Sequence, residues 1–139
     1  MGRWVITLDS SAIFALLNRA DPDHRPVRVG LEDDRGPYLV PVGILAEVAF
    51  MVERRLGVQV LDGFLGDLES GGFSLDCGEQ ALPRIRELIL RYEDLRLGFA
   101  DATVVACAER HGGRVLTLDR RHFDVVAGEG KIEVLPERD

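Results

Sequence analysis

Cysteine is scarce in this chain, which excludes a disulfide-rich framework. Only two of the 139 residues are cysteines, Cys77 and Cys107. A small secreted scaffold stapled by disulfides carries more cysteines, in paired spacings. We find no metal-binding partner near either residue in the sequence. We therefore expect two free, inert thiols in a reducing compartment.

Long hydrophobic runs are also absent. No apolar segment approaches the ~20 residues that a membrane-spanning helix needs. The apolar N-terminal stretch is broken at Asp9, and no clean cleavage site follows it. We therefore expect a cytoplasmic protein. Hydrophobic residues make up 46% of the chain and charged residues 29%, which is typical of a globular protein. The length predicts a single domain over residues 1–139.

Positive charge is limited, and lysine is almost missing. Of the 17 basic residues only Lys131 is a lysine, and the formal net charge is −7. Proteins that bind nucleic acid are usually basic, so this balance disfavours such a partner unless acidic side chains cluster around a metal ion. The histidines have no ligand spacing between them, and we expect surface or helix-end positions for all three: His24, His111 and His122.

Short apolar segments alternate with helical patterns along the chain. Buried strands are predicted at residues 3–8, 38–40, 73–75, 114–118 and 132–135. Helices are predicted between them, at residues 11–20, 23–35, 41–56, 58–69, 79–95, 99–111 and 122–127. This alternation predicts an α/β fold with a central parallel sheet covered by helices on both faces. In such folds the functional crevice lies beyond the carboxyl ends of the strands.

Three acidic residues are placed at that edge. Asp9 directly follows the first strand, Asp119 follows the strand that ends at residue 118, and Asp101 lies in the first turn of its helix. Each has an ordinary structural alternative, because aspartate caps helices, stabilises their first turn and forms turns. Together they predict a cluster of carboxylates at the carboxyl edge of the sheet.

Glu47 is the most informative single residue. It is the only charged residue between positions 41 and 52, where an unpaired carboxylate is costly to bury. An ion pair with Arg54 or a more distant arginine is the alternative. Two like charges ~5 Å apart repel by roughly 3 kcal/mol at an effective dielectric of 20. Four clustered carboxylates therefore require a cation, and an all-oxygen ligand set favours Mg²⁺ or Mn²⁺.

The four acids lie in stretches that occur in the order LDSSAIFALL, LAEVAF, LGFADATVVACAERHGG and VLTLDRRHF. In this order the stretches resemble the PIN domain, and more closely the VapC toxins of type II toxin–antitoxin pairs. The resemblance covers nearly the whole chain, although residues 57–95 match only in helical character. It implies a three-layer α/β/α sandwich and a single PIN-like nuclease domain.

The resemblance also implies an activity. It implies a Mg²⁺- or Mn²⁺-dependent endoribonuclease that cleaves structured RNA, such as tRNA or rRNA, by attack of water on a phosphodiester. The implied catalytic quartet is Asp9, Glu47, Asp101 and Asp119. Within it, Asp9 and Asp101 would be the inner metal ligands, and Ser11 and Thr117 match supporting hydroxyl positions. Such toxins are commonly homodimers neutralised by a VapB-type antitoxin.

Four arginines are weaker candidates for contacts to the RNA backbone: Arg54, Arg55, Arg120 and Arg121.

Other classes of protein remain as alternatives. A phosphatase of the haloacid-dehalogenase type also uses Mg²⁺ and an Asp after the first strand. It normally needs a second Asp where this chain has Ser11. A receiver domain needs a lysine facing its acidic pocket, and the only lysine here lies late in the chain. A non-catalytic acidic interaction module is the remaining alternative, which the complete quartet disfavours.

Overall fold

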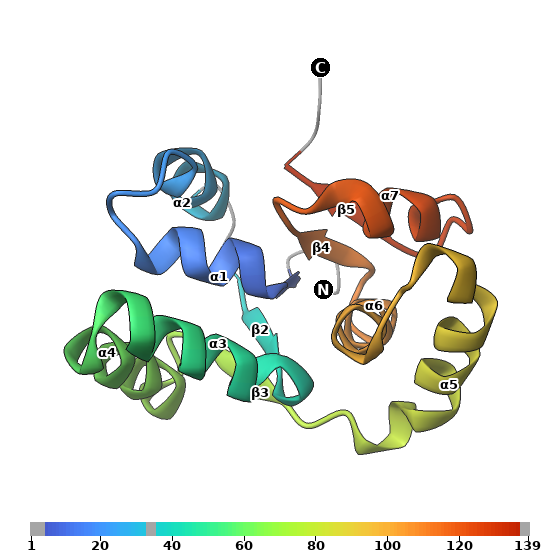
Figure 1. Cartoon of the computed structure of the whole chain (residues 1–139), viewed down its shortest axis with the longest axis horizontal. Coiled ribbons are helices and arrows are strands. Elements are labelled where there is room, and N and C mark those ends of the chain that lie inside the picture. Colours follow the sequence, from blue (N-terminus) through green and yellow to red (C-terminus); the bar gives the residue numbers. More distant parts are fainter. Residues whose placement is uncertain (1–4, 33–35, 137–139) are drawn as a thin grey trace.

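A central parallel sheet organises the structure (Figure 1), a computed structural model that describes residues 5–32 and 36–136. Within these ranges the sheet has five strands: β1 (Ile6–Leu8), β2 (Tyr38–Pro41), β3 (Ser74–Asp76), β4 (Arg114–Leu116) and β5 (Glu133–Leu135). Their order in the sheet is β3-β2-β1-β4-β5, and every neighbouring pair is parallel. The parallel sheet predicted from the sequence is thereby confirmed.

Helices follow the strands and cover both faces of the sheet. The described ranges contain α1 (Ser10–Leu17), α2 (His24–Glu32), α3 (Val42–Leu56), α4 (Val58–Ser70), α5 (Leu82–Arg91), α6 (Phe99–Arg110) and α7 (Arg120–Ala127). Figure 1 shows α1 to α4 on one side of the sheet and α5 to α7 on the other. The fold is therefore the expected three-layer α/β/α sandwich. None of the described helices is both long enough and apolar enough to cross a membrane.

The helix predicted at residues 79–95 is shorter than expected. The regular helix is α5, and it is flanked by single 3₁₀ turns at Glu79–Ala81 and Glu93–Leu95. Pro83 lies in the first turn of α5, because proline lacks the N–H that later helical positions must donate. After the second 3₁₀ turn, the backbone of Arg96 is left-handed, with φ of 59°. A right-handed helix cannot continue through this residue.

Helix α6 lies against the centre of the sheet. Seven consecutive residues, 102–108, are buried, and all of them are small or β-branched. A helix that is buried on all sides has little freedom to shift, because close packing resists displacement. The start of α6, where Asp101 lies, is therefore held in a fixed place beside the sheet.

Helices α3 and α6 approach each other closely at Gly43 and Thr103. A Cβ atom on Gly43 would lie 2.7 Å from Cγ2 of Thr103 and 2.8 Å from its Oγ1. Alanine usually stabilises a helix relative to glycine by about 1 kcal/mol, but here it would overlap a short side chain packed in the core. We expect Gly43→Ala to lower the free energy of unfolding by about 1–3 kcal/mol in urea denaturation.

The matched control for this substitution is Gly63→Ala in α4. No atom lies within 4 Å of a Cβ built on Gly63, so only the gain in helix propensity remains. This variant should be stabilised by up to about 1 kcal/mol. Stabilisation of both variants to the same extent would contradict the close approach of α3 and α6.

Candidate active site

Asp9 is held in one orientation where β1 passes into α1. It is the N-cap of α1, and its Oδ1 accepts hydrogen bonds from the amide of Ala12 at 3.0 Å and the hydroxyl of Ser11 at 2.7 Å. Its Oδ2 accepts a third hydrogen bond, from the hydroxyl of Thr117 at 2.5 Å. Only 5% of Asp9 is exposed. Three donors and burial therefore fix the position of this carboxylate.

The same two hydroxyls shape the end of β4. Ser11 Oγ accepts a hydrogen bond from the amide of Leu118, and Thr117 Oγ1 accepts one from the amide of Asp119, both at 3.0 Å. These side-chain contacts replace strand pairing, so β4 ends at Leu116, two residues earlier than predicted. The side chain of Asp119 is exposed and makes no capping bond to α7.

Burial changes the acidity of Asp9. Burial and, to a smaller extent, the negative charge of Asp101 raise the pKa of Asp9, the three hydrogen bonds lower it, and the net pKa is about 6. Asp9 and Asp101 are thus close enough to repel each other. No cationic side chain of residues 5–32 and 36–136 forms an ion pair with Asp9. A cation bound between the two carboxylates would reduce this repulsion and favour the ionised form of Asp9.

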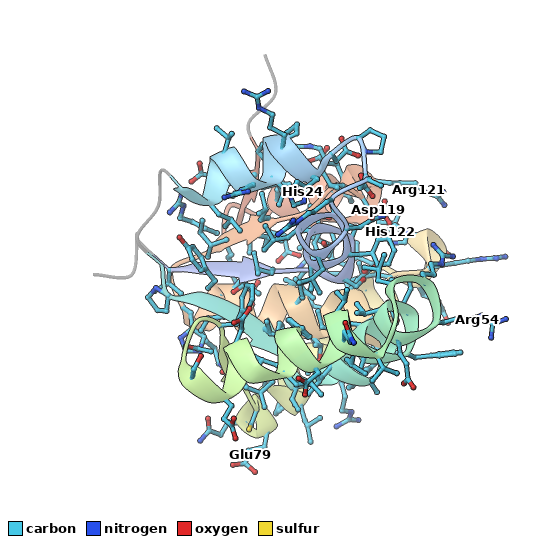
Figure 2. All side chains as sticks on the ribbon, turned by 90° about the vertical axis from the view of Figure 1, so that its left-hand side faces the viewer. His24, Arg54, Glu79, Asp119, Arg121 and His122 are labelled. Carbon is cyan, nitrogen blue, oxygen red and sulfur yellow. The ribbon has the colours of Figure 1, made fainter. Side chains whose placement is uncertain are left out.

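Asp101 has a partner that the sequence did not reveal. Its Oδ2 lies 2.6 Å from Nδ1 of His122, in the first turn of α7, and both side chains are largely shielded from solvent. Figure 2 shows His122 close to Asp119 at this end of the molecule. We expected a surface or helix-end histidine, and His122 does lie at a helix start. Its imidazole nevertheless contacts an acidic residue of the predicted quartet, which its spacing to the other histidines could not indicate.

Glu47 is exposed, whereas the sequence analysis expected its carboxylate to be buried. The buried stripe of α3 is Ile44, Val48 and Val52, and Glu47 lies beside this stripe with an exposed side chain. The expectation of a costly buried carboxylate was wrong, because Glu47 lies off the apolar face. No ion pair joins it to Arg54 in the described part of the chain. Burial therefore does not support the assignment of Glu47 to the metal site.

The structure brings together only part of the predicted quartet. Asp9 and Asp101 interact, and the backbone amide of Asp119, not its carboxylate, is linked to Asp9 through the hydroxyl of Thr117. Among the described residues, no three members of the quartet have carboxylate oxygens within 4.8 Å of one another. The assignment of Glu47 and Asp119 to one site with the other two stays a prediction.

Two of the candidate RNA-binding arginines begin α7. Arg120 bonds to Asp124, with a nitrogen–oxygen distance of 3.2 Å, and to the carbonyl of Pro136, and only 14% of its side chain is exposed. Arg121 is exposed, and no hydrogen bond or ion pair joins it to the part of the chain that the structure describes. Arg121 is therefore the better placed of the two to contact a ligand in solvent.

The other two candidate arginines end α3. The guanidinium carbon of Arg54 lies 6.0 Å from the ring centre of Phe50, and that of Arg55 lies 5.7 Å from the ring centre of Phe14. Both side chains are exposed, and Figure 2 shows Arg54 extending away from the protein. Aromatic contacts of this kind orient the arginines without neutralising their charge.

The acidity of Asp9 predicts how the stability of the metal-free protein varies with pH. Its pKa of about 6 in the folded protein exceeds the ordinary value of 3.8, so the folded state binds this proton more tightly. The resulting stabilisation is fully present below pH 3.8 and is lost as the pH rises through 6. A difference of about two pKa units corresponds to at most about 3 kcal/mol.

We therefore expect Asp9→Asn to become more stable relative to the unmodified protein as the pH rises from about 4 to 7. Urea denaturation in the presence of a chelator measures this difference at each pH. The control is Asp62→Asn, which makes the same chemical change at an exposed position of α4 and should not reproduce the trend of Asp9→Asn. A constant difference for Asp9→Asn as well would contradict the raised pKa.

Known proteins resemble this chain in sequence over almost its whole length. Residues 6–129 match the PIN domain. Ribonuclease VapC26 of Mycobacterium tuberculosis is 34% identical over 133 residues, which cover 93% of this chain and 98% of that protein. These matches agree with the resemblance found in the sequence motifs.

Solved structures show the same fold. VapC20 of Mycobacterium tuberculosis, a toxin that cleaves the sarcin–ricin loop, matches with a TM-score of 0.66 at 22% identity, over 77% of this chain and 83% of that one. VapBC2 of Rickettsia felis, crystallised with a DNA fragment from its promoter, matches with a TM-score of 0.70 at 13% identity, over 96% and 99%. At these identities the structural matches establish the fold, and the sequence matches establish the family. The chain belongs to the PIN-domain family, among its VapC members.

Proposed function

We propose that this protein is a metal-dependent endoribonuclease that cleaves structured RNA as the toxin of a toxin–antitoxin pair. The observation that carries the proposal is the pair of carboxylates formed by Asp9 and Asp101 at the carboxyl edge of the parallel sheet. The sequence similarity to ribonuclease VapC26 supports RNA as the substrate. The structural similarity to VapC20 supports a fold suited to a toxin.

The side chains at this edge fit a divalent metal ion, which nucleases of the PIN family generally use. All the donor atoms are oxygens, and Asp9 is a buried carboxylate without a cationic partner among the described residues. Oxygen ligands favour Mg²⁺ or Mn²⁺ over zinc. Asp9 and Asp101 would hold the ion. Glu47 and Asp119, both exposed, would complete its shell, partly through water.

The protein contributes positioning to the reaction. When bound, a divalent ion supplies charge stabilisation at the phosphate and makes water more acidic. The hydrogen bonds from Ser11, Ala12 and Thr117 keep Asp9 in place, and His122 orients Asp101. Glu47 or Asp119 would accept the proton of the water that attacks phosphorus in line. Cleavage would then leave 5′-phosphate and 3′-hydroxyl ends.

The proposed toxin needs a partner that neutralises it. We propose a VapB-type antitoxin and a homodimeric toxin, as in the family. The structural match to VapBC2, solved as a toxin–antitoxin complex on DNA, supports a partner of this kind. Co-expression with the product of the neighbouring reading frame should yield a stable complex without ribonuclease activity. If that product neither binds nor inhibits the protein, this pairing is wrong.

Cleavage assays test the proposed reaction. Purified protein should cut folded tRNA or rRNA at discrete sites in Mg²⁺ or Mn²⁺, because a divalent ion held by Asp9 and Asp101 would supply charge stabilisation at the phosphate. EDTA should abolish cleavage, and added Mg²⁺ should restore it. End-labelling should find 5′-phosphates on the products. Cleavage that continues in EDTA would rule out the metal-dependent mechanism.

A further inference from the structure

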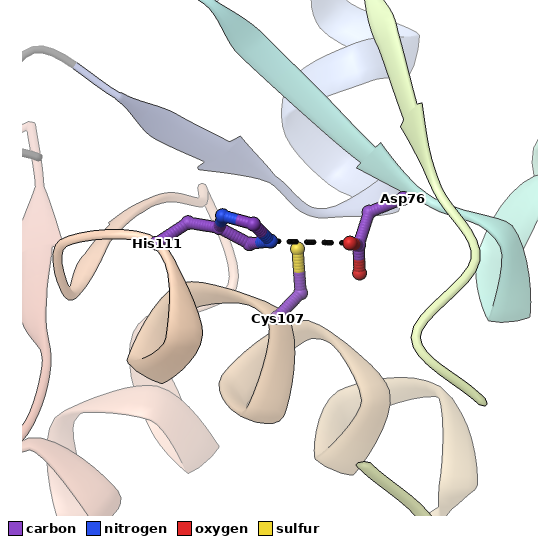
Figure 3. A group of neighbouring side chains, drawn as sticks. All are labelled: Asp76, Cys107 and His111. Atoms are coloured by element: carbon purple, nitrogen blue, oxygen red, sulfur yellow. Dashed lines mark hydrogen bonds and ion pairs between the residues drawn. The ribbon is translucent and has the colours of Figure 1, made fainter. Parts of the chain in front are cut away.

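A second group of metal-ligating side chains lies near the other end of α6. Figure 3 shows Asp76, Cys107 and His111 converging, and one ligand atom from each lies within 4.8 Å of the other two. Cys107 and His111 are four residues apart, so they share one face of the helix, and Asp76 is the last residue of β3. The sequence analysis found no metal-binding partner near Cys107, although His111 lies four residues beyond it and the fold brings Asp76 to the same place.

The three side chains are held together without a metal by hydrogen bonds. Nε2 of His111 lies 3.1 Å from Oδ1 of Asp76, and Arg110 pairs with the other carboxylate oxygen, Oδ2. Only 1% of Cys107 is exposed, and its sulfur lies 3.5 Å from the hydroxyl of Thr7. Arg110 therefore occupies one oxygen of Asp76, and the other oxygen faces the imidazole.

We propose that Asp76, Cys107 and His111 form a second metal site, which binds zinc or a similar borderline divalent cation. A sulfur, a nitrogen and an oxygen ligand make a mixed set that suits zinc, and they differ from the all-oxygen set of the proposed active site. The site is independent of the proposed ribonuclease function, because it shares no residue with the acidic quartet.

Zinc prefers four ligands, so the three side chains would leave one coordination position for a water molecule. A cavity of about 20 Å³ borders Asp76, although neither Cys107 nor His111 lines it. This volume accommodates one water molecule. Three protein ligands and one water complete the tetrahedral coordination that zinc prefers. A metal ion bound by these residues would link the C-terminal end of α6 to β3, at the edge of the sheet.

A metal ion that binds at this site must displace the proton of the Cys107 thiol. Burial raises the pKa of Cys107 to about 12, so the thiol is protonated at neutral pH. The metal must replace this proton, which leaves the sulfur and passes to solvent as the metal–sulfur bond forms. Binding should therefore tighten as the pH rises.

Cobalt provides a direct probe, because a Co²⁺–thiolate bond gives a charge-transfer absorption in the near ultraviolet. We expect the full-length, reduced and metal-free protein to develop this band with one equivalent of Co²⁺ and to lose it when Zn²⁺ is added. Cys107→Ala should lack the band, and His111→Gln should weaken Co²⁺ binding at least 10-fold. Circular dichroism identifies variants that remain folded. Cys107 is buried, so its substitution can also affect folding. His111 is partly exposed, and His111→Gln therefore provides a second, independent test.

Two matched controls test whether the Co²⁺–thiolate band arises at Cys107. Cys77 is exposed and adjoins Asp76, so Cys77→Ser tests for adventitious binding and should keep the band. Asp9→Asn alters the proposed active site and should also keep it. The proposal is overturned if the folded, unmodified protein gives no thiolate band. It is equally overturned if the band persists in Cys107→Ala and disappears in Cys77→Ser.

Discussion

Asp9→Asn and Asp101→Asn are each expected to slow RNA cleavage about a thousand-fold at saturating Mg²⁺. A divalent ion at a phosphodiester contributes several kcal/mol of transition-state stabilisation, and about 4 kcal/mol corresponds to a thousand-fold in rate. Each substitution removes one of the two negative charges that face each other at the sheet edge. Single-turnover cleavage of a labelled RNA measures the effect on the chemical step.

The control for this prediction is Asp62→Asn, which makes the same chemical change on an exposed position of α4. Figure 1 places α4 on the opposite side of the sheet from α6 and α7. This variant should cleave RNA at the unmodified rate. Asp9→Asn should remain folded, because its amide oxygen can still accept from Ala12 and Ser11. Cleavage within a factor of three of the unmodified rate by a folded Asp9→Asn protein would show that Asp9 is not part of the active site.

His122→Ala is expected to lower the cleavage rate at limiting Mg²⁺ by about 10–100-fold, the usual effect of removing a residue that orients a metal ligand. The imidazole bonds directly to Asp101 at 2.6 Å, so its loss leaves this carboxylate free to rotate. Higher Mg²⁺ concentrations should recover part of the rate, because the ligand itself remains. His122→Asn retains a donor at the position of Nδ1 and should therefore lose less activity than His122→Ala.

His24→Ala provides the comparison for His122. The Nδ1 atom of His24 lies 2.9 Å from the carbonyl oxygen of Ala15, a contact that joins α1 and α2 without involving the quartet. We expect His24→Ala to change thermal stability but not the Mg²⁺ concentration that gives half-maximal cleavage. His122 is a positioning residue only if its substitution raises that concentration. An unchanged Mg²⁺ dependence in His122→Ala would assign the imidazole a purely structural role.

The sequence predicted those features that depend on local pattern. Short apolar runs located the five described strands, and the acids at their ends marked the edge where Asp9 and Asp101 meet. These predictions succeeded because a parallel sheet brings the carboxyl ends of its strands together, whatever the length of the connections.

Contacts between distant elements were not predictable in the same way. Glu47 was singled out by the composition of its neighbours, but its exposure depends on which face of α3 packs against the core. The contact between His122 and Asp101 depends on how α7 lies relative to α6. Cys107 and His111 did carry a local signal, since residues four apart share a helix face. The third member of that group, Asp76, comes from another element and was not predictable.

Binding of Mn²⁺, followed by electron paramagnetic resonance, tests most directly whether separate elements form one metal site. Free Mn²⁺ gives a sharp signal that broadens when the ion is bound by protein oxygens. We predict saturable Mn²⁺ binding to the unmodified protein and to Asp62→Asn, and at least 10-fold weaker binding to Asp9→Asn and Asp101→Asn. Equal Mn²⁺ affinity in Asp9→Asn and the unmodified protein would contradict the account.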